Sequence, residues 1–300
     1  MKAFRSSWDP IGEPTTSVAR VAPTPTEDEP VPSNGFRATA LLDVRGLQIT
    51  GKTRTDASVL ATGISLSVAR GEVIGLVGVA GSGTREIALA IAGRLPETAM
   101  ITAGSILVDG RELVGASRST LKRLRDTKLS LISPAAPLGL APDLAIGRQL
   151  ARTLRRRQGL SRSVAARRAV ELLDQVGLPD PRATSLLVSA QLDPTALLQV
   201  TVTAAVCFHP DILILDDPPR APNAVGETSA LQLCLRFRQE FGLSIIVASG
   251  DLGGAAATCD RVAVVEAGRV VEQGSAAEIV DSPQHPYTRR LLEAARATRG

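Results

Sequence analysis

The stretch VGVAGSGTRE, residues 77–86, has the glycine spacing of a phosphate-binding loop, and the helical pattern IALAIAGRL follows it. In such a loop, glycines free successive backbone N–H groups to surround a phosphate at a helix N-terminus, while a lysine neutralises charge and a Ser or Thr holds magnesium. The predicted cradle residues are Gly78, Gly81, Ser82 and Gly83. Thr84 and Arg85 stand where the lysine and the magnesium-binding hydroxyl are needed. The sequence therefore keeps the cradle and lacks both polar groups.

The run DILILDD, residues 211–217, provides a second candidate group. Its apolar centre is typical of a buried strand, and Asp216 follows that centre directly. A glycine turn between a strand and a helix is by itself weak evidence for phosphate binding. A second strand that ends in an aspartate strengthens it, because P-loop proteins use such a residue to position magnesium. Asp216 is therefore the candidate metal ligand.

Strands that alternate with helices must position these residues. The β patterns LLDVRGLQIT, ISLSV and EVIGLVG precede the loop, and a helical LQLCLRFRQEF, a strand LSIIVAS and the β pattern VAVVEAGRVVEQG follow DILILDD. This order predicts an α/β fold with a largely parallel core sheet. Residues 140–200 have mostly helical patterns and are predicted to form an inserted subdomain. Residues 1–40 are rich in Pro, Thr and acidic residues, which predicts a disordered N-terminal tail.

Composition limits the classes of protein to consider. With 300 residues, 44% of them hydrophobic, the chain can bury a substantial core. Cys207, Cys234 and Cys259 lack the paired spacing of a zinc site and are too few for a disulfide framework, which favours a reducing compartment. We expect Cys207 and Cys234 to be core residues, and His209 and His285 to be structural. No apolar stretch reaches the roughly 18 residues of a membrane span, so we predict a cytoplasmic protein with at most peripheral membrane contact.

Basic residues gather at 118–128 and 151–168 in a chain of net charge +4. Aromatic residues make up only 2% of the chain, so no stacking platform accompanies them and no nucleic-acid partner is expected. The apolar spacing of both stretches fits amphipathic helices. Two interpretations stay open: a solvated helix face, which is the commoner meaning of such runs, or a surface for acidic headgroups or a partner.

Several stretches resemble the ATP-binding subunits of ABC transporters, in particular the oligopeptide and dipeptide importer group. They are VIGLVGVAGSGTREIALAIAGRL, HPDILILDDPP, GLSIIVASGDLG, CDRVAVVEAGRVVEQG and SPQHPYTRRLL. The last resembles the H-P-Y-T-x-x-L-L segment that follows the domain in peptide and nickel importers. The resemblance covers Leu41 to Ala297 and implies a P-loop NTPase-like ABC domain at 41–281, with an antiparallel β subdomain and a helical subdomain, followed by a C-terminal segment at 282–300.

The chain departs from this family at most polar positions of the nucleotide site. Thr84 stands at the Walker A lysine and Arg85 at the magnesium-binding Ser/Thr. In ISPAA, Pro134 replaces the Gln-loop glutamine. The general-base glutamate position holds the shorter Asp217, and Gly250 stands at the switch histidine.

The signature loop, L-S-G-G-[QM] in the family, has also changed. The residues at that position are Leu192, Asp193, Pro194, Thr195 and Ala196, so the serine and both glycines are lost. The D-loop position is occupied by Ala221, Pro222 and Asn223. No aromatic residue near GKTRT is available to stack on adenine.

These departures predict weak or absent ATP binding and doubtful Mg²⁺ binding. A charge-assisted hydrogen bond contributes about 1.5–3 kcal/mol, so Thr84 in place of lysine weakens ATP binding by a factor of tens to thousands. Arg85 can bind phosphate oxygens bidentately, or it can supply the charge that magnesium otherwise brings. We predict that its guanidinium pairs with Asp216 or Asp217 across the cleft, the alternative being an arginine turned to solvent.

The resemblance implies an ATP-binding-subunit homologue of an ABC peptide importer, and the altered residues imply a catalytically degenerate partner with little or no ATP hydrolysis. The implied partners are a second ABC ATP-binding subunit, in a heterodimer or a homodimer, and integral membrane permease subunits at the cytoplasmic face of the membrane. Two alternatives stay open. One is a functional ATP-hydrolysing importer subunit, and the other is a regulatory or scaffolding protein with the ABC fold.

Overall fold

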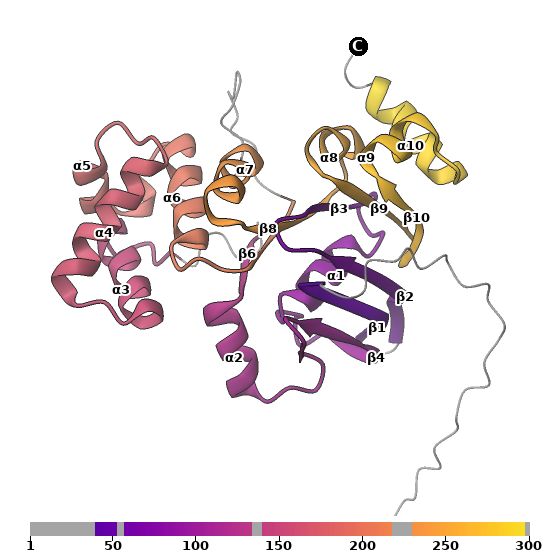
Figure 1. The fold of residues 1–300 in the computed structure, drawn as a ribbon, viewed down its shortest axis with the longest axis horizontal. Helices are drawn as coiled ribbons and strands as arrows, with labels where there is room; N and C mark the ends of the chain where they lie inside the picture. The colour runs from indigo at the N-terminus through magenta and orange to yellow at the C-terminus, as the bar shows by residue number, and fades with distance from the viewer. Residues whose placement is uncertain (1–39, 53–56, 134–139, 218–229, 298–300) are drawn as a thin grey trace, which may run out of the picture. The chain divides into compact units, whose positions relative to one another are not determined.

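A computed structural model describes residues 40–52, 57–133, 140–217 and 230–297. A six-stranded sheet has the strand order β10-β9-β3-β8-β7-β6 (Figure 1). Its strands are β3 (Val73–Val77), β6 (Leu129–Ile132), β7 (Ile212–Asp216), β8 (Ser244–Ser249), β9 (Arg261–Glu266) and β10 (Arg269–Ser275). All neighbours pair in parallel except β9 and β10, which are antiparallel. The predicted α/β fold with a mainly parallel core sheet is confirmed.

Strands β3, β7, β8 and β9 are buried on both faces, which explains why they are continuous apolar runs rather than alternating patterns. In β3, Val73 and Val77 belong to one hydrophobic cluster, whereas Ile74 and Leu76 belong to another. The first cluster includes residues of the helices that cover one face, and the second includes residues of α1 and of a second sheet. The loops at the carboxyl ends of the core strands are therefore held by packing on both sides of the sheet.

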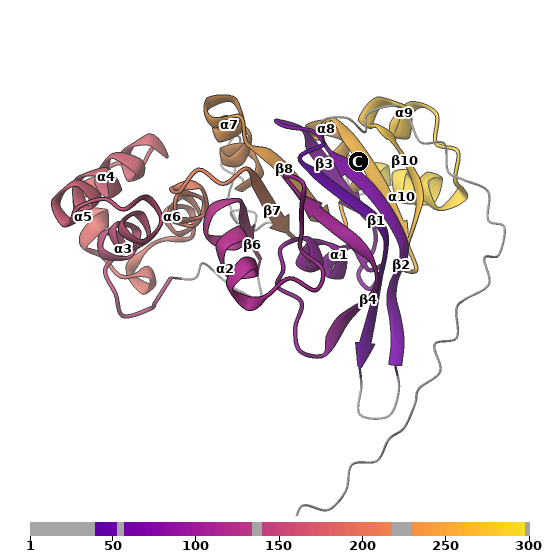
Figure 2. The same cartoon turned by 60° about the horizontal axis from the view of Figure 1, so that its bottom comes forward.

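The second sheet is antiparallel and has the order β2-β1-β4-β5. Its strands are β1 (Leu42–Lys52), β2 (Ala57–Val68), β4 (Ala99–Val108) and β5 (Arg111–Glu112). Figure 2 shows β1, β2 and β4 beside α1 (Thr84–Ile91). Ile64 of β2 and Ile87 of α1 are fully buried in the shared cluster. The antiparallel β part that the family resemblance implies is present.

The helices between β6 and β7 pack on one another (Figure 1). They are α3 (Ile146–Gln158), α4 (Arg162–Gln175), α5 (Pro181–Leu186) and α6 (Pro194–Val206), with the short 3₁₀ helix η2 (Ser189–Gln191). Side-chain caps fix three of their starts: Ser161 accepts from Val164 N, Asp180 from Ala183 N, and Asp193 from two amides.

The remaining helices border the two sheets. They are α2 (Arg118–Thr127), α7 (Ala230–Phe241), α8 (Leu252–Thr258), α9 (Ala276–Asp281) and α10 (Pro286–Ala297). Among the described residues, no helix combines the length and the apolar character needed to cross a membrane.

Cysteines and histidines have structural surroundings. The three thiols are free and buried, and burial raises the pKa of Cys207 to about 12. The ring of His209 packs edge-on against Phe241 at 4.6 Å, and His285 Nδ1 accepts from the backbone N–H of Tyr287 at 3.3 Å. Within the described ranges, no group of three or more His, Cys, Asp and Glu side chains is arranged to hold a metal ion. The predicted core positions of Cys207 and Cys234 are confirmed.

Candidate nucleotide site

The glycine loop connects β3 to α1, and its backbone conformation requires glycine. Gly81 and Gly83 have φ angles of 82° and 98°, in the left-handed region. A Cβ on Gly83 would lie 2.5 Å from Leu60 O, and one on Gly78 would lie 2.3 Å from Val265 O. The loop has no room for side chains at these positions, so the sequence has kept the shape of the cradle.

Contacts from distant parts of the chain hold this loop in place. Gly268 N donates to Ser82 O at 2.8 Å, and Val79 N donates to the Tyr287 hydroxyl at 3.1 Å. The Ser82 hydroxyl is buried and lies 3.4 Å from Thr84 Oγ1. Tyr287 belongs to the HPYT segment, for which the sequence predicted no structural role. Local sequence patterns cannot predict that α10 contacts a loop some 200 residues earlier in the chain.

Thr84 and Arg85 begin α1, at the end of the cradle. The Thr84 side chain is short and mostly buried, so it cannot extend to phosphates as a lysine does. The Arg85 guanidinium reaches across to β7, where its Nε lies 3.4 Å from Asp216 Oδ2. The predicted pairing of Arg85 with a Walker B carboxylate is confirmed, with Asp216 as the partner.

Asp216 is buried at the end of β7, and its Oδ2 has a second partner. The Ser133 hydroxyl donates to this same oxygen at 2.6 Å. The Asp216 side chain is 5% exposed, whereas that of Arg85 is 49% exposed, so the carboxylate sits inside the cleft and the guanidinium closes it from outside. Sequence reasoning missed Ser133. The register of β6 with β7 explains its position: Ile132 pairs with Leu215, so the next residues along these parallel strands, Ser133 and Asp216, lie side by side.

These residues do not fit a magnesium ion. Mg²⁺ needs octahedral oxygen ligands, and proteins hold it through one or two carboxylates together with substrate phosphates. Here a guanidinium, which has five donors and no acceptor, contacts the carboxylate that the ion requires. A cation fixed beside Asp216 also repels a divalent ion electrostatically.

Two positions that the family uses for hydrolysis are close to this group. Asp217 is exposed with φ 46°, and its backbone N–H donates to Ala248 O at 2.8 Å. Gly250 follows β8 beside the cradle, because a Cβ there would lie 3.7 Å from Gly78 O. The structure thus brings the switch position to the loop, with room for a side chain and no imidazole to fill it.

The signature-loop position lies in another element, at the start of α6. Leu192 is the C-cap of η2, Asp193 is the N-cap of α6, and Pro194 is the first residue of α6. Asp193 Oδ1 accepts from Thr195 N at 2.8 Å and from Ala196 N at 2.9 Å. The backbone N–H groups at this helix terminus are therefore already bound to a carboxylate of their own chain.

Two further predicted positions cannot be placed. Pro134, at the Gln-loop position, lies outside the described residues. So do the D-loop residues Ala221, Pro222 and Asn223.

A family model described as ABC transporter matches residues 61–220 of the chain. Among curated proteins, a putative peptide import ATP-binding protein of Brucella melitensis is 32% identical over 258 residues, which covers 84% of this chain and 76% of that protein. The oligopeptide transport ATP-binding protein OppD of Bacillus subtilis is also 32% identical, over 86% of this chain and 72% of its own length.

Solved structures agree on the fold. A dimeric ATP-binding cassette in a post-hydrolysis state with ADP and Pi superposes with a TM-score of 0.68 at 20% identity, covering 78% of this chain and 98% of that one. The structure of cbiO1 from Clostridium perfringens gives 0.66 at 21% identity, over 87% of this chain and all of that one. At such identities the likeness supports the fold alone.

Proposed function

Because the chain belongs to the ABC transporter family, we propose that it is an ATP-binding-subunit homologue of a peptide importer, acting as a catalytically degenerate partner of an intact ATPase subunit. The names of its relatives support the peptide-import assignment. The observation that carries the degeneracy is the Arg85–Asp216 ion pair, since its cation contacts the carboxylate that the family uses for magnesium.

The residues of the site oppose metal-dependent hydrolysis in two ways. Asp216 Oδ2 is already shared between Ser133 and Arg85, so a magnesium ion must displace a protein donor before it can bind. The general-base and switch positions are also altered, and general acid–base groups typically contribute about 100- to 10,000-fold to a rate. We therefore expect this chain to hydrolyse ATP very slowly or not at all.

Weak nucleotide binding remains compatible with the site. The backbone cradle is intact, and Arg85 can turn from Asp216 to phosphate oxygens because half of its side chain is exposed. Such binding needs no metal ion. Of the partners that the described residues give Asp216, it leaves Ser133 alone, so nucleotide and Asp216 compete for the same guanidinium.

Asp193 extends the degeneracy to the partner. In the family, two subunits dimerise head to tail and each glycine loop faces the signature loop of the other. In this chain the second residue of the signature position is Asp193, whose Oδ1 already accepts from the amides of Thr195 and Ala196. A phosphate in the partner's site would meet a negative charge where it needs free N–H donors. Pairing with this chain therefore weakens both composite sites. The further proposed partners are permease subunits at the cytoplasmic face of the membrane.

Titration with labelled ATP tests the proposal. Thr84→Lys combined with Arg85→Ser restores the two missing groups on an intact cradle, and we expect ATP binding that strengthens on addition of magnesium. Thr84→Lys alone is the matched control: it restores the lysine but keeps the Arg85–Asp216 pair, so its binding should not respond to magnesium.

An assay of ATP hydrolysis by the unaltered chain distinguishes the proposal from its alternatives. We expect a rate no higher than that of the Asp216→Asn variant. A magnesium-dependent turnover that Asp216→Asn abolishes would instead identify a functional importer ATPase. A protein that binds a partner with no response to nucleotide in any variant would identify a scaffold.

A further inference from the structure

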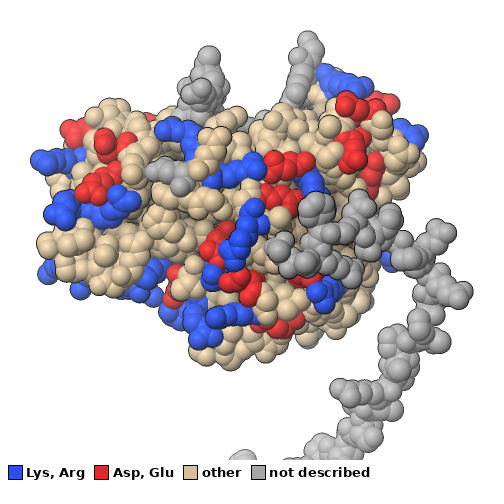
Figure 3. Space-filling view, viewed as in Figure 1, with Lys and Arg blue, Asp and Glu red and all other residues tan. Residues whose placement is uncertain are grey.

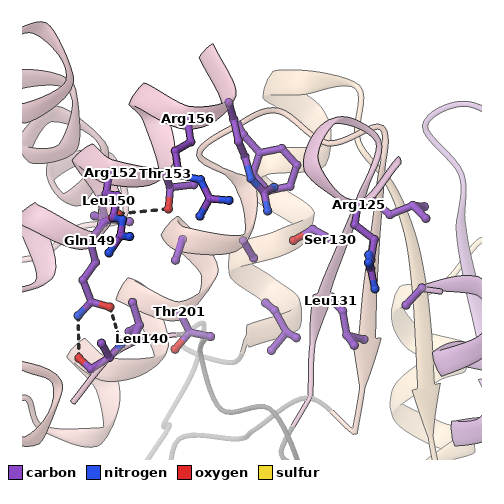
Figure 4. Close-up of a pocket in the computed structure, with 18 of the residues that line it drawn as sticks. Arg125, Ser130, Leu131, Leu140, Gln149, Leu150, Arg152, Thr153, Arg156 and Thr201 are labelled. Carbon is purple, nitrogen blue, oxygen red and sulfur yellow. Dashed lines mark hydrogen bonds between the residues drawn. The ribbon is translucent and has the colours of Figure 1, made fainter. Parts of the chain in front are cut away.

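The two basic stretches of the sequence meet at one pocket. Its volume is about 450 Å³, and it lies between α2, α3, α6 and the edge strand β6 (Figure 4). Five arginines line it: Arg94, Arg125, Arg152, Arg156 and Arg157. None of the described lining residues is acidic. Over the face shown in Figure 3, by contrast, basic and acidic side chains are interspersed.

Arg157 is fixed in place and incompletely satisfied. Its Cζ lies 3.7 Å from the centroid of the Phe208 ring, a cation–π contact that holds the guanidinium plane. Its Nη2 lies 3.5 Å from Asp126 Oδ1, but its Nη1 is buried and has no hydrogen-bond partner among the described residues. Loss of solvation lowers the pKa of Arg157 against the opposing effect of Asp126. A buried guanidinium donor without an acceptor is unfavourable, and an anion at this point would satisfy it.

The other arginines converge from two walls of the pocket. Figure 4 shows Arg152 and Arg156 on one side and Arg125 across from them. Arg125 Nη1 donates to Gly93 O at 3.1 Å. Arg152 and Arg156 form no ion pair with any described carboxylate. Arg94, Arg152 and Arg156 are exposed, and among the described residues only Asp126 pairs with an arginine of the pocket. The pocket therefore has a large excess of positive charge.

The loop beside the pocket is held by Gln149. Its side-chain oxygen accepts from Ala141 N at 2.6 Å, and its amide donates to Ala141 O at 2.9 Å and to Leu144 O at 2.6 Å (Figure 4). The pocket is therefore lined by fixed backbone as well as by the partly buried Arg157. Its floor is apolar, with Leu129, Ile132 and Leu150 among the buried lining residues.

We propose that this pocket binds a small organic phosphate, whose phosphate is held by the arginines of both walls and whose organic part rests on the apolar floor. Arginine forks match phosphate oxygens bidentately, and pockets of about 300–1,000 Å³ are typical of small-molecule sites. The proposal does not depend on the nucleotide site, because none of the lining residues belongs to the glycine loop or to the Asp216 group.

Binding of inorganic pyrophosphate to the full chain tests the site. We expect the Arg152→Gln, Arg156→Gln double variant to lose at least tenfold in affinity by calorimetry, since two charge-assisted contacts are removed. The matched control is Arg148→Gln with Arg155→Gln. It removes two exposed arginines from the same helix that do not line the pocket, and its affinity should change less than twofold. The two variants carry equal charge, so a general electrostatic effect, or binding at the glycine loop, would change both alike.

A second arm identifies the source of the phosphate. Co-sedimentation with phosphatidylcholine vesicles that contain phosphatidic acid, lost only in the pocket double variant, would assign the phosphate to a lipid headgroup. Soluble pyrophosphate binding without vesicle binding would assign it to a free metabolite. Three results would overturn the proposal: equal losses of affinity in both double variants, no pyrophosphate binding at millimolar concentration, or binding of polyglutamate alone. Binding of polyglutamate alone would identify the pocket as a site for an acidic protein segment.

Discussion

Replacing Arg85 by alanine removes the cation that closes the magnesium position. Asp216 keeps its burial and its hydrogen bond from Ser133, but loses the only charged partner that the described residues give it. If the ion pair is the structural substitute for a metal ion, Arg85→Ala should destabilise the fold and at the same time create a site that magnesium can occupy. A solvent-facing arginine would have neither effect.

The magnitude follows from the unequal exposure of the two partners. Breaking a fully buried pair costs about 3–5 kcal/mol, and an exposed pair contributes about 0–1 kcal/mol. Here the carboxylate is 5% exposed and the guanidinium 49%, so water screens one partner only. We expect a loss of about 1–2 kcal/mol, which lowers Tm by about 2–8 °C for a domain of this size.

Thermal unfolding with and without magnesium is the assay. A site with a Kd of about 5 mM stabilises the fold by about 0.6 kcal/mol at about 10 mM Mg²⁺, or roughly 1–3 °C. We expect this gain in Arg85→Ala and none in the unaltered chain. Arg148→Ala, which removes an exposed arginine elsewhere, controls for the general effect of charge. An Arg85→Ala variant with unchanged Tm and no response to magnesium would refute the reasoning.

Three further predictions concern other parts of the molecule. Tyr287→Phe removes the acceptor of Val79 N, and a net hydrogen bond of about 1 kcal/mol predicts roughly fivefold faster hydrogen exchange at that amide, measured by NMR, with α10 protection unchanged. Asp193→Ala removes the α6 cap and should lower the free energy of urea unfolding by about 1 kcal/mol, whereas Asp193→Ser should restore most of it. Burial raises the pKa of Cys207 to about 12 and that of Cys259 to about 11, so both thiols stay protonated at pH 8. We expect both to react with a disulfide reagent only after denaturant has unfolded the protein. Fast labelling of the folded protein would contradict their burial.

The core of the fold was predictable because its signals are local. The run ILIL before Asp216 can be buried on both sides only in a covered parallel sheet, and the structure places it in β7 between β6 and β8. The glycine loop was equally predictable, since positive φ at Gly81 and Gly83 is a property of the residues themselves. The disordered tail at 1–40 and the Gln-loop role of Pro134 remain predictions, because residues 1–39 and 134–139 lie outside the described residues.

Side-chain partners across the site were predictable only where charge demanded them. The Arg85–Asp216 pair followed from two facts about charge: a P-loop fold brings both positions to one ion, and without that ion the carboxylate needs a cation. Ser133 and Tyr287 are uncharged, so no requirement for an opposite charge predicts their partners. A serine after an apolar strand and a tyrosine in a C-terminal helix have many possible partners, and only the register of β6 with β7 and the docking of α10 select the observed ones.

The substitutions around the nucleotide site are better understood as replacements than as simple losses. A site that had only lost groups would leave the Asp216 carboxylate and the α6 amides unpaired in the cleft, and unpaired buried polar groups are destabilising. Instead, Arg85 pairs with Asp216, and Asp193 binds the amides of Thr195 and Ala196. Each new side chain supplies, from within the chain, the charge that a magnesium ion or a phosphate provides in the family. These contacts stabilise the fold without nucleotide. On the proposed degeneracy, we predict that ATP hydrolysis needs the removal of Arg85 and Asp193 as well as the addition of a lysine, a glutamate and a histidine at the altered positions.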